Sequence, residues 1–171
     1  MRDLPNPGFP GDDGTASEEV RAAMAAYDAD PDARHDATLE VLQRARLLVP
    51  VVALLGEVAQ HSDGLARDKT SDMATVLTRG RDGRTALLAF TSTDTLGRWD
   101  QQARPVPVSV DRAARAALQD DAAAIVVDVA GPVMFVVDGA DLDELARGSV
   151  LVRVGPVGGV SGRYGWVTPG R

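Results

Sequence analysis

The sequence contains no cysteine, so neither a disulfide framework nor a thiolate metal site can form. It contains two histidines, His35 and His61, which are too few for a histidine-rich metal cluster. Lysine occurs once, as Lys69, against seventeen arginines. No apolar run reaches the roughly 18 residues of a membrane-spanning helix, and no basic and apolar leader opens the chain. These absences predict a cytoplasmic protein with no membrane contact, no bound metal and no cofactor.

Negative charge is concentrated at one end of the sequence. The net charge is −7 over 171 residues, and residues 1–36 hold nine acidic residues against three arginines. The remaining residues are close to neutral, which argues against an extended nucleic-acid-binding face. Two interpretations of the acidic segment stay open. It steers the protein to a basic partner, or it provides solubility as a loosely docked pair of helices.

A strand, turn and helix between residues 84 and 100 organise the predicted fold. Residues 87–90 (LLAF) are apolar on both faces, which is typical of a central strand covered on both sides. A polar turn at residues 92–94 follows, and then a short helix that ends near Trp99. Further strands are predicted at residues 47–55, 73–79, 105–110, 123–129 and 133–137, with another possible after residue 148. Helices are predicted from Ser17 or Thr15, from Asp30, over residues 111–119, and from Asp138 or Asp141.

The order of these elements predicts an α/β fold. Strand, helix, strand, helix, strand over residues 85–129 predicts parallel neighbours, and hairpins on either side add antiparallel strands. Pro50 predicts an edge or a bulge within the strand at 47–55, and the prolines at 105 and 107 predict an edge strand. We therefore expect a single domain with a mixed, partly parallel sheet flanked by helices and preceded by an acidic helical segment.

The same pattern predicts four parts of the chain. Residues 1–16 form a disordered tail, since they contain almost nothing to bury. Residues 17–45 form the acidic helical segment, residues 46–154 the α/β domain, and residues 155–171 a Gly/Pro-rich tail that is extended or mobile.

Three stretches imitate known motifs without completing them. Asp28, Asp30 and Asp32 begin like a calcium loop but lack its glycine and its bidentate glutamate, so helix capping explains them better. Residues 61–63 read His-Ser-Asp, yet three consecutive side chains cannot stack as a catalytic triad. Residues 155–162 are Gly-rich but carry no Gly-Lys-Ser/Thr and start no helix. None of the three predicts a reaction.

The turn after the central strand is one candidate binding site. Ser92, Thr93 and Asp94 follow the carboxyl end of a predicted parallel strand, where α/β sheets bind ligands, and Arg98 lies one turn further. A helix N-terminus there can hold an anion, although Asp94 would repel one. Helix capping explains the same hydroxyl groups. Asp128 interrupts another apolar strand and is expected to face solvent by simple alternation.

The second candidate is the stretch at residues 56–72. It is much longer than a connection between two antiparallel strands requires, and it holds His61, Lys69, Ser71 and Asp72. A single lysine among many arginines indicates a position that suits a compact ammonium group. We therefore predict an interaction site here, with two alternatives. Ser71 and Asp72 shape the start of the next strand, or the loop is disordered.

Four stretches carry a resemblance to a known family: LLVPVVA (47–53), DKTSDMATVL (68–77), TALLAFTSTDTLGRWD (85–100) and AAIVVDVAGPVMFVVDGADLDELARG (123–148). With PVPVSV at 105–110, they make the chain resemble the SseB family in its actinobacterial form. The resemblance implies an α/β domain of the SseB N-terminal type, with no established catalytic or cofactor-binding residue. It also implies a link to translation or amino-acid metabolism.

The sequence favours a non-enzymatic binding or regulatory domain whose partner is another protein, and the resemblance implies that this partner is associated with translation. It offers no nucleophile with a base, no metal-ligand set and no cofactor loop. The alternative is a small-molecule sensor or enzyme with a pocket at the turn formed by Thr91 to Thr95.

Overall fold

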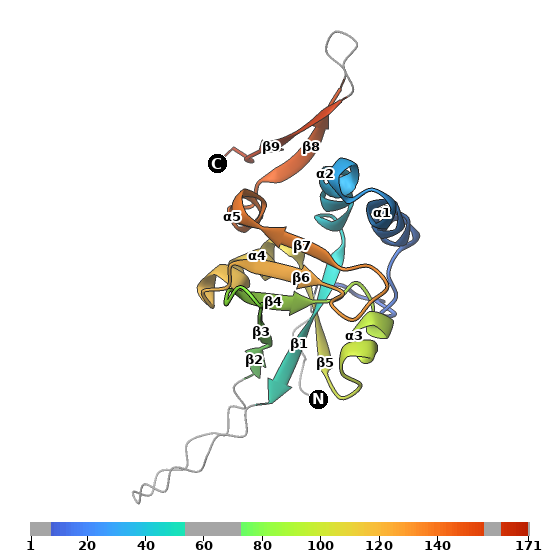
Figure 1. Ribbon diagram of the computed structural model, residues 1–171, viewed down its shortest axis with the longest axis vertical. Helices are drawn as coiled ribbons and strands as arrows, with labels where there is room; N and C mark the ends of the chain where they lie inside the picture. The colour runs from blue at the N-terminus through green and yellow to red at the C-terminus, as the bar shows by residue number, and fades with distance from the viewer. Residues whose placement is uncertain (1–7, 54–72, 156–161, 171) are drawn as a thin grey trace, which may run out of the picture.

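The computed structural model describes residues 8–53, 73–155 and 162–170. Its helices are α1 (Glu18–Ala29), α2 (Pro31–Leu42), α3 (Thr93–Trp99), α4 (Val110–Gln119) and α5 (Gly139–Ala146) (Figure 1). Its strands are β1 (Arg46–Ala53), β2 (Met73–Thr75), β3 (Leu77–Arg79), β4 (Thr85–Ala89), β5 (Arg104–Ser109), β6 (Ala124–Val127), β7 (Phe135–Asp138), β8 (Val150–Val154) and β9 (Arg163–Val167).

Strand β4 lies inside a mixed sheet with the order β3-β4-β6-β7. It runs parallel to β6, with Leu87 opposite Ile125, while β3 and β7 add antiparallel edges. Leu87 and Ala89 belong to the larger of two apolar cores, whereas Leu88 and Phe90 belong to the smaller one. Because successive residues of a strand point to opposite faces, both faces of β4 are covered. The predicted α/β class, mixed sheet and doubly covered strand are confirmed.

Strand β5 does not lie beside β4. It pairs with β1 in a second, antiparallel sheet of order β2-β1-β5. Pro105 and Pro107 have no N–H groups, so β5 bonds on one side and takes an edge, as predicted. The prediction of parallel neighbours across β4, β5 and β6 was wrong for β5. The chain instead crosses from β4 through this second sheet before β6 joins β4.

Pro50 lies in β1, the middle strand of the second sheet, at neither an edge nor a bulge. The backbone N–H and C=O of Leu48 both bond to Phe90 at 2.8 Å, so they point away from β5. Alternation along β1 turns the nitrogen of Pro50 to the same side. The register with β2 places Val76 opposite, and its carbonyl already accepts from Leu88 N–H at 3.2 Å. The missing N–H of Pro50 therefore removes no bond.

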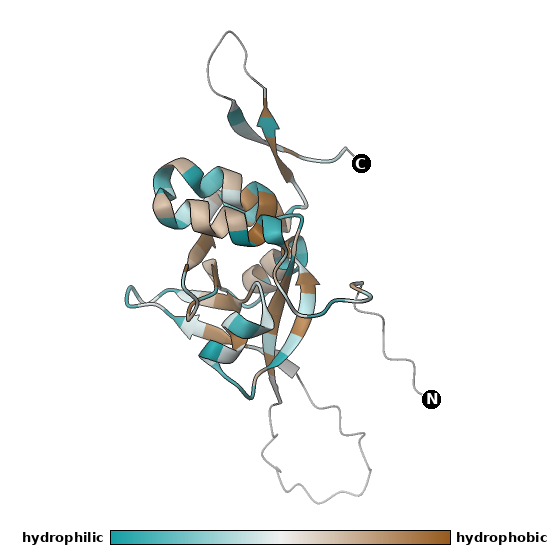
Figure 2. Ribbon diagram, turned by 90° about the vertical axis from the view of Figure 1, so that its right-hand side faces the viewer, coloured by the Kyte–Doolittle hydropathy of each residue, from teal (hydrophilic) through white to brown (hydrophobic). Residues whose placement is uncertain are grey.

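The helices cover the two faces of the β4 sheet unequally. Helices α1, α2, α4 and α5 pack on the larger core, and α3 covers the other face with Leu96. Trp99 at the end of α3 contacts Phe90, with ring centroids 5.6 Å apart. Figure 2 shows the hydrophobic segments concentrated on the strands and on the helices packed against them. Among the described helices, none combines the length and the apolar character needed to cross a membrane.

Capping side chains fix where the first helices begin. Ser17 Oγ accepts from Val20 N–H at 3.3 Å and starts α1. Asp30 accepts from Ala33 N–H at 3.2 Å and starts α2, with Pro31 as its first residue. These bonds confirm the predicted starts at Ser17 and Asp30, and they satisfy N–H groups that the helices cannot pair internally.

Strand β9 is absent from the sequence prediction, which expects an extended or mobile segment from Gly155 onward. It pairs with β8, and Leu151 lies opposite Trp166. Leu151 is buried, and its N–H and C=O bond to the Gln43 side chain at 2.8 and 2.6 Å. The alternation of Tyr164 and Trp166 places both rings on the face that packs against the larger core. The β8-β9 ribbon is thus anchored at its base to α2.

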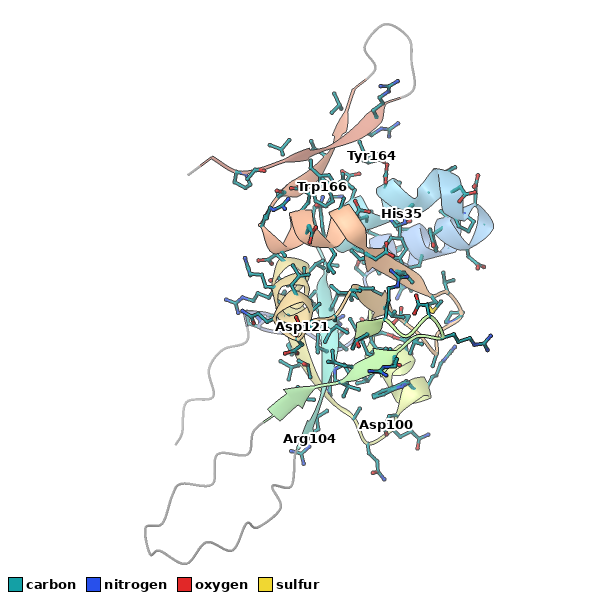
Figure 3. The ribbon with its side chains drawn as sticks, turned by 60° about the vertical axis from the view of Figure 1, so that its left-hand side comes forward. His35, Asp100, Arg104, Asp121, Tyr164 and Trp166 are labelled. Carbon is teal, nitrogen blue, oxygen red and sulfur yellow. The ribbon has the colours of Figure 1, made fainter. Side chains whose placement is uncertain are left out.

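A second anchor joins the ribbon to two helices through one carboxylate. Asp141 in α5 bonds to His35 Nε2 at 3.0 Å and accepts from Trp166 Nε1 at 3.3 Å. The His35 ring also stacks on Phe135, with centroids 5.0 Å apart and planes at 18°. Figure 3 shows His35 and Trp166 on neighbouring elements beside α5. His35 therefore has a packing role in this cluster.

Candidate functional site

A cavity of about 490 Å³ opens at the carboxyl ends of the parallel strands β4 and β6. One wall is formed by α1, another by the turn after β4 and the start of α3, and a third by residues 14–16 and the β6-β7 connection. Its lining comprises Gly14, Thr15, Ala16, Val20, Arg21, Met24, Ala25, Asp28, Thr91, Ser92, Asp94, Thr95, Arg98, Asp128, Pro132 and Val133.

The structure gathers most of the predicted turn site at this cavity. Ser92, Asp94 and Arg98 line it, while Thr93 does not. The N–H and hydroxyl of Thr93 instead donate to the carbonyl of Gly14, at 2.8 and 3.2 Å. His61, Lys69, Ser71 and Asp72 lie outside the described residues, so the interaction site expected at residues 56–72 stays a prediction.

The hydroxyl groups of the turn act as a helix cap. Ser92 Oγ accepts from Thr95 N–H at 3.2 Å, and Thr95 Oγ1 accepts from Ser92 N–H at 3.3 Å. This reciprocal capping box starts α3. The capping interpretation is therefore confirmed for Ser92 and Thr95, whose hydroxyls form part of a rigid wall.

Asp128 is buried beneath this wall. Its side chain accepts from Thr91 N–H at 2.8 Å and from Thr91 Oγ1 at 2.6 Å, and the residue is 3% exposed. The expectation that Asp128 faces solvent was wrong. Strand β6 ends at Val127, and Asp128 adopts a φ of 55°, which breaks the alternation and turns the carboxylate toward β4. Asp128 thus holds the Thr91 turn in place.

The wall formed by α1 was not identified from the sequence. Arg21, Met24, Ala25 and Asp28 are spaced by three and four residues, so they share one helical face. The sequence predicted a helix from Ser17 or Thr15 but no site on it. The spacing of these residues marks one face of α1, and only the tertiary structure places that face in the same cavity lining as the start of α3.

Residues 12–16, which we term the N-terminal strap, close the cavity on one side. Asp12 receives bonds from Arg46 Nε and Nη2 at 2.6 and 2.9 Å, and Arg46 also donates to the carbonyls of Thr15, at 2.8 Å, and Thr91. Gly14 has a φ of 79°, and a Cβ added there would lie 2.6 Å from Thr93 Cγ2. These residues belong to the stretch expected to be a disordered tail, yet they bond to β1 and α3.

The Arg46 guanidinium, which donates to Asp12, holds the pKa of that carboxyl below its ordinary value of 3.8. The N–H of Gly14 acts in the same direction, while partial burial opposes both. Asp12 is therefore ionised, and paired, throughout the neutral range.

Acidic pH is expected to weaken the strap. Because the folded pKa of Asp12 is depressed, its contribution to stability is complete only well above the ordinary value of 3.8 and is lost as the pH falls through the folded pKa. Urea unfolding should show Asp12→Asn less stable than the native protein by about 1 kcal/mol at neutral pH, with the difference shrinking in stronger acid. Asp143→Asn, on the exposed side of α5, serves as the control. A difference that stays constant into strong acid would contradict the assignment.

Among the described residues, no group of three histidine, aspartate or glutamate side chains is arranged to hold a metal ion. The cavity instead carries charged side chains of both signs. Arg21 and Arg98 are basic, and Asp28, Asp94 and the buried Asp128 are acidic. Arg21 Nη1 donates to the carbonyl of Ala16 at 3.0 Å, which ties α1 to the strap.

The fold and the cavity define an α/β domain with a ligand-sized pocket at the carboxyl end of its parallel strands. In a family comparison, the SseB protein N-terminal domain matches residues 20–154. The chain belongs to the SseB family. No curated protein and no solved structure matches it. The strap lies before the matched residues, although it forms one wall of the pocket.

Proposed function

We propose that this SseB-family domain is a non-catalytic regulatory domain that binds a small molecule in the cavity between α1, α3 and the strap. The observation that carries the proposal is the position of the cavity. Ligands of α/β proteins bind beyond the carboxyl ends of parallel strands, and β4 and β6 both end there. The volume of about 490 Å³ lies within the range of small-molecule sites.

The bonding of the cavity hydroxyls supports binding over nucleophilic catalysis. Thr91 Oγ1 donates to Asp128, and the hydroxyls of Ser92 and Thr95 lie 3.3 Å apart. A hydroxyl nucleophile needs a neighbouring base and access to the substrate. Thr91 has the Asp128 carboxylate beside it, but both residues are buried. Among the described residues, the one histidine is His35, which bonds to Asp141 outside the cavity lining. These groups are therefore suited to shaping a wall.

A bound molecule could regulate the protein through its contacts with the strap. Gly14, Thr15 and Ala16 contact the cavity directly, so an occupant that touches them favours the docked strap. The strap lies within residues 1–36, the acidic part of the sequence that is suited to a basic protein partner. A ligand in the cavity would then change how accessible these acidic residues are to the partner. The expected link to translation or amino-acid metabolism stays a prediction.

Filling the cavity provides the test. The native protein should gain several degrees in melting temperature when a metabolite collection contains its ligand well above the dissociation constant. Ala25→Trp places a large ring into the cavity from an exposed position of α1 and should abolish this gain. Ala22→Trp, at an exposed position of the same helix that does not line the cavity, should retain it.

Two results would contradict the proposal. Equal gains in Ala25→Trp and Ala22→Trp would place the ligand elsewhere. If the native protein converts a bound metabolite and Ala25→Trp abolishes this turnover, the cavity is an active site and the proposed binding function is wrong.

A further inference from the structure

Helix α3 carries an acid and a base one turn apart that do not pair. Asp94 and Arg98 are both exposed, and neither forms an ion pair with another described residue. The same spacing gives ion pairs elsewhere in the chain, between Asp111 and Arg115 in α4 and between Glu40 and Arg44 in α2. The pair on α3 thus leaves its carboxylate and its guanidinium open to a ligand.

Both open groups line the cavity, and the opposite wall is partly apolar. Val20, Met24 and Ala25 of α1 contribute that wall, and Val133 of the β6-β7 connection adds an apolar side chain to the lining. A simple anion would be attracted by Arg98 but repelled by Asp94. A simple cation would be attracted by Asp94 but repelled by Arg98. A molecule with both charges close together satisfies each group, and an apolar substituent can contact α1.

We infer that the ligand class of the proposed binding site is a small zwitterion with an apolar substituent, of the type of a free apolar amino acid. Arg98 receives the carboxylate and Asp94 the ammonium group. Residues one helical turn apart have Cβ atoms about 5–6 Å apart, which suits the adjacent charges of such a ligand. Charge-assisted bonds to both ends supply selectivity, and the apolar wall supplies contact area. This inference rests on the proposed function of the cavity.

A second hollow competes for the same two side chains. Asp94 and Arg98 also border a shallow groove on the outer side of α3, together with Thr93, Gly97 and Gln101. That groove has no aliphatic or aromatic side chain in its lining, so it offers an apolar substituent nothing to contact. The apolar wall therefore favours the cavity, and Ala25→Trp separates the two because it fills only the cavity.

Matched ligands test the inference by calorimetry on the full chain. The probes are leucine, methionine and phenylalanine, each compared with the amine that lacks its carboxylate and with the acid that lacks its ammonium group. At least one amino acid should bind about tenfold more tightly than both of its analogues, since each lost charge removes a charge-assisted contact. Binding should disappear in Ala25→Trp.

Arg98→Gln should lower the affinity for that amino acid to the level of its amine, and Asp94→Asn should lower it to the level of its acid. Arg112→Gln, an exposed substitution on α4, should leave it unchanged. The inference is overturned if no amino acid binds better than its analogues, or if Ala25→Trp still binds it. If other metabolites then stabilise the native protein but not Ala25→Trp, the proposed function stands without this ligand class. If none does, the proposed function fails as well.

Discussion

Replacing Arg46 by alanine is expected to lower the free energy of unfolding by about 2–4 kcal/mol and to release the strap. The guanidinium bonds to the carboxylate of Asp12 at 2.6 Å, to the carbonyl of Thr15 at 2.8 Å and to the carbonyl of Thr91. Its side chain is 11% exposed, so water replaces these bonds poorly. The loss affects three segments at once, because Arg46 joins β1, the strap and the turn after β4.

Urea unfolding measures the loss, and hydrogen exchange of residues 12–16 reports whether the strap detaches. Arg46→Lys should be intermediate, since an ammonium group cannot reproduce the fork of the guanidinium. Arg44→Ala is the control, because its side chain is 60% exposed and its one ion pair among the described residues is with Glu40. Its effect should stay within about 0.5 kcal/mol. Equal effects for Arg44→Ala and Arg46→Ala would show that the strap adds nothing to stability.

Replacing Asp128 by alanine is expected to cost about 3 kcal/mol, because it leaves two buried donors of Thr91 without an acceptor. The φ of 55° at Asp128 adds backbone strain to the cost of the alanine variant, and this strain can be measured separately from the lost hydrogen bonds. Asp128→Gly loses the same bonds but relieves the backbone, so it should be about 1 kcal/mol less damaging than Asp128→Ala. Asp128→Asn keeps one acceptor oxygen and tolerates this backbone, so it should be the mildest of the three.

Asp121 is the matched control for this series. It has the same φ of 55°, but it is exposed and no described side-chain bond involves its carboxylate. Asp121→Gly should therefore be neutral or stabilising, and Asp121→Ala should cost only the backbone strain of about 1 kcal/mol. Denaturant unfolding of both series isolates the hydrogen bonds. If Asp128→Ala costs no more than Asp121→Ala, the bonds to Thr91 do not stabilise the fold.

Local patterns predicted the elements of the fold well. The unbroken apolar run over residues 87–90 indicated a strand covered on both faces, and hydroxyl and carboxylate side chains marked the starts of α1, α2 and α3. These signals are local, since a cap acts on N–H groups within three residues and a strand alternates with period two. For the same reason, Ser92, Asp94 and Arg98 could be proposed as a site from the sequence.

Long-range contacts account for what the sequence analysis missed. The alternation along its strand predicts that Asp128 is exposed. Its hydrogen-bond partner, Thr91, is distant in sequence, so this contact could not be foreseen. Arg46 similarly reads as one of many arginines until Asp12 and Thr15 are placed beside it. In both cases the residue type permits several roles, and only the neighbour selects one.

The sequence by itself determined the α/β class, the mixed sheet, the strand-turn-helix unit at residues 85–99 and the resemblance to the SseB family. The fold elements depend on local patterns and their order along the chain, which the folded structure preserves, and the resemblance depends on the matching stretches themselves. The tertiary structure alone decided that β5 joins β1, that residues 12–16 form a strap and that one face of α1 completes a cavity. These features depend on which surfaces bury each other, and such pairings follow from the packing of the whole domain.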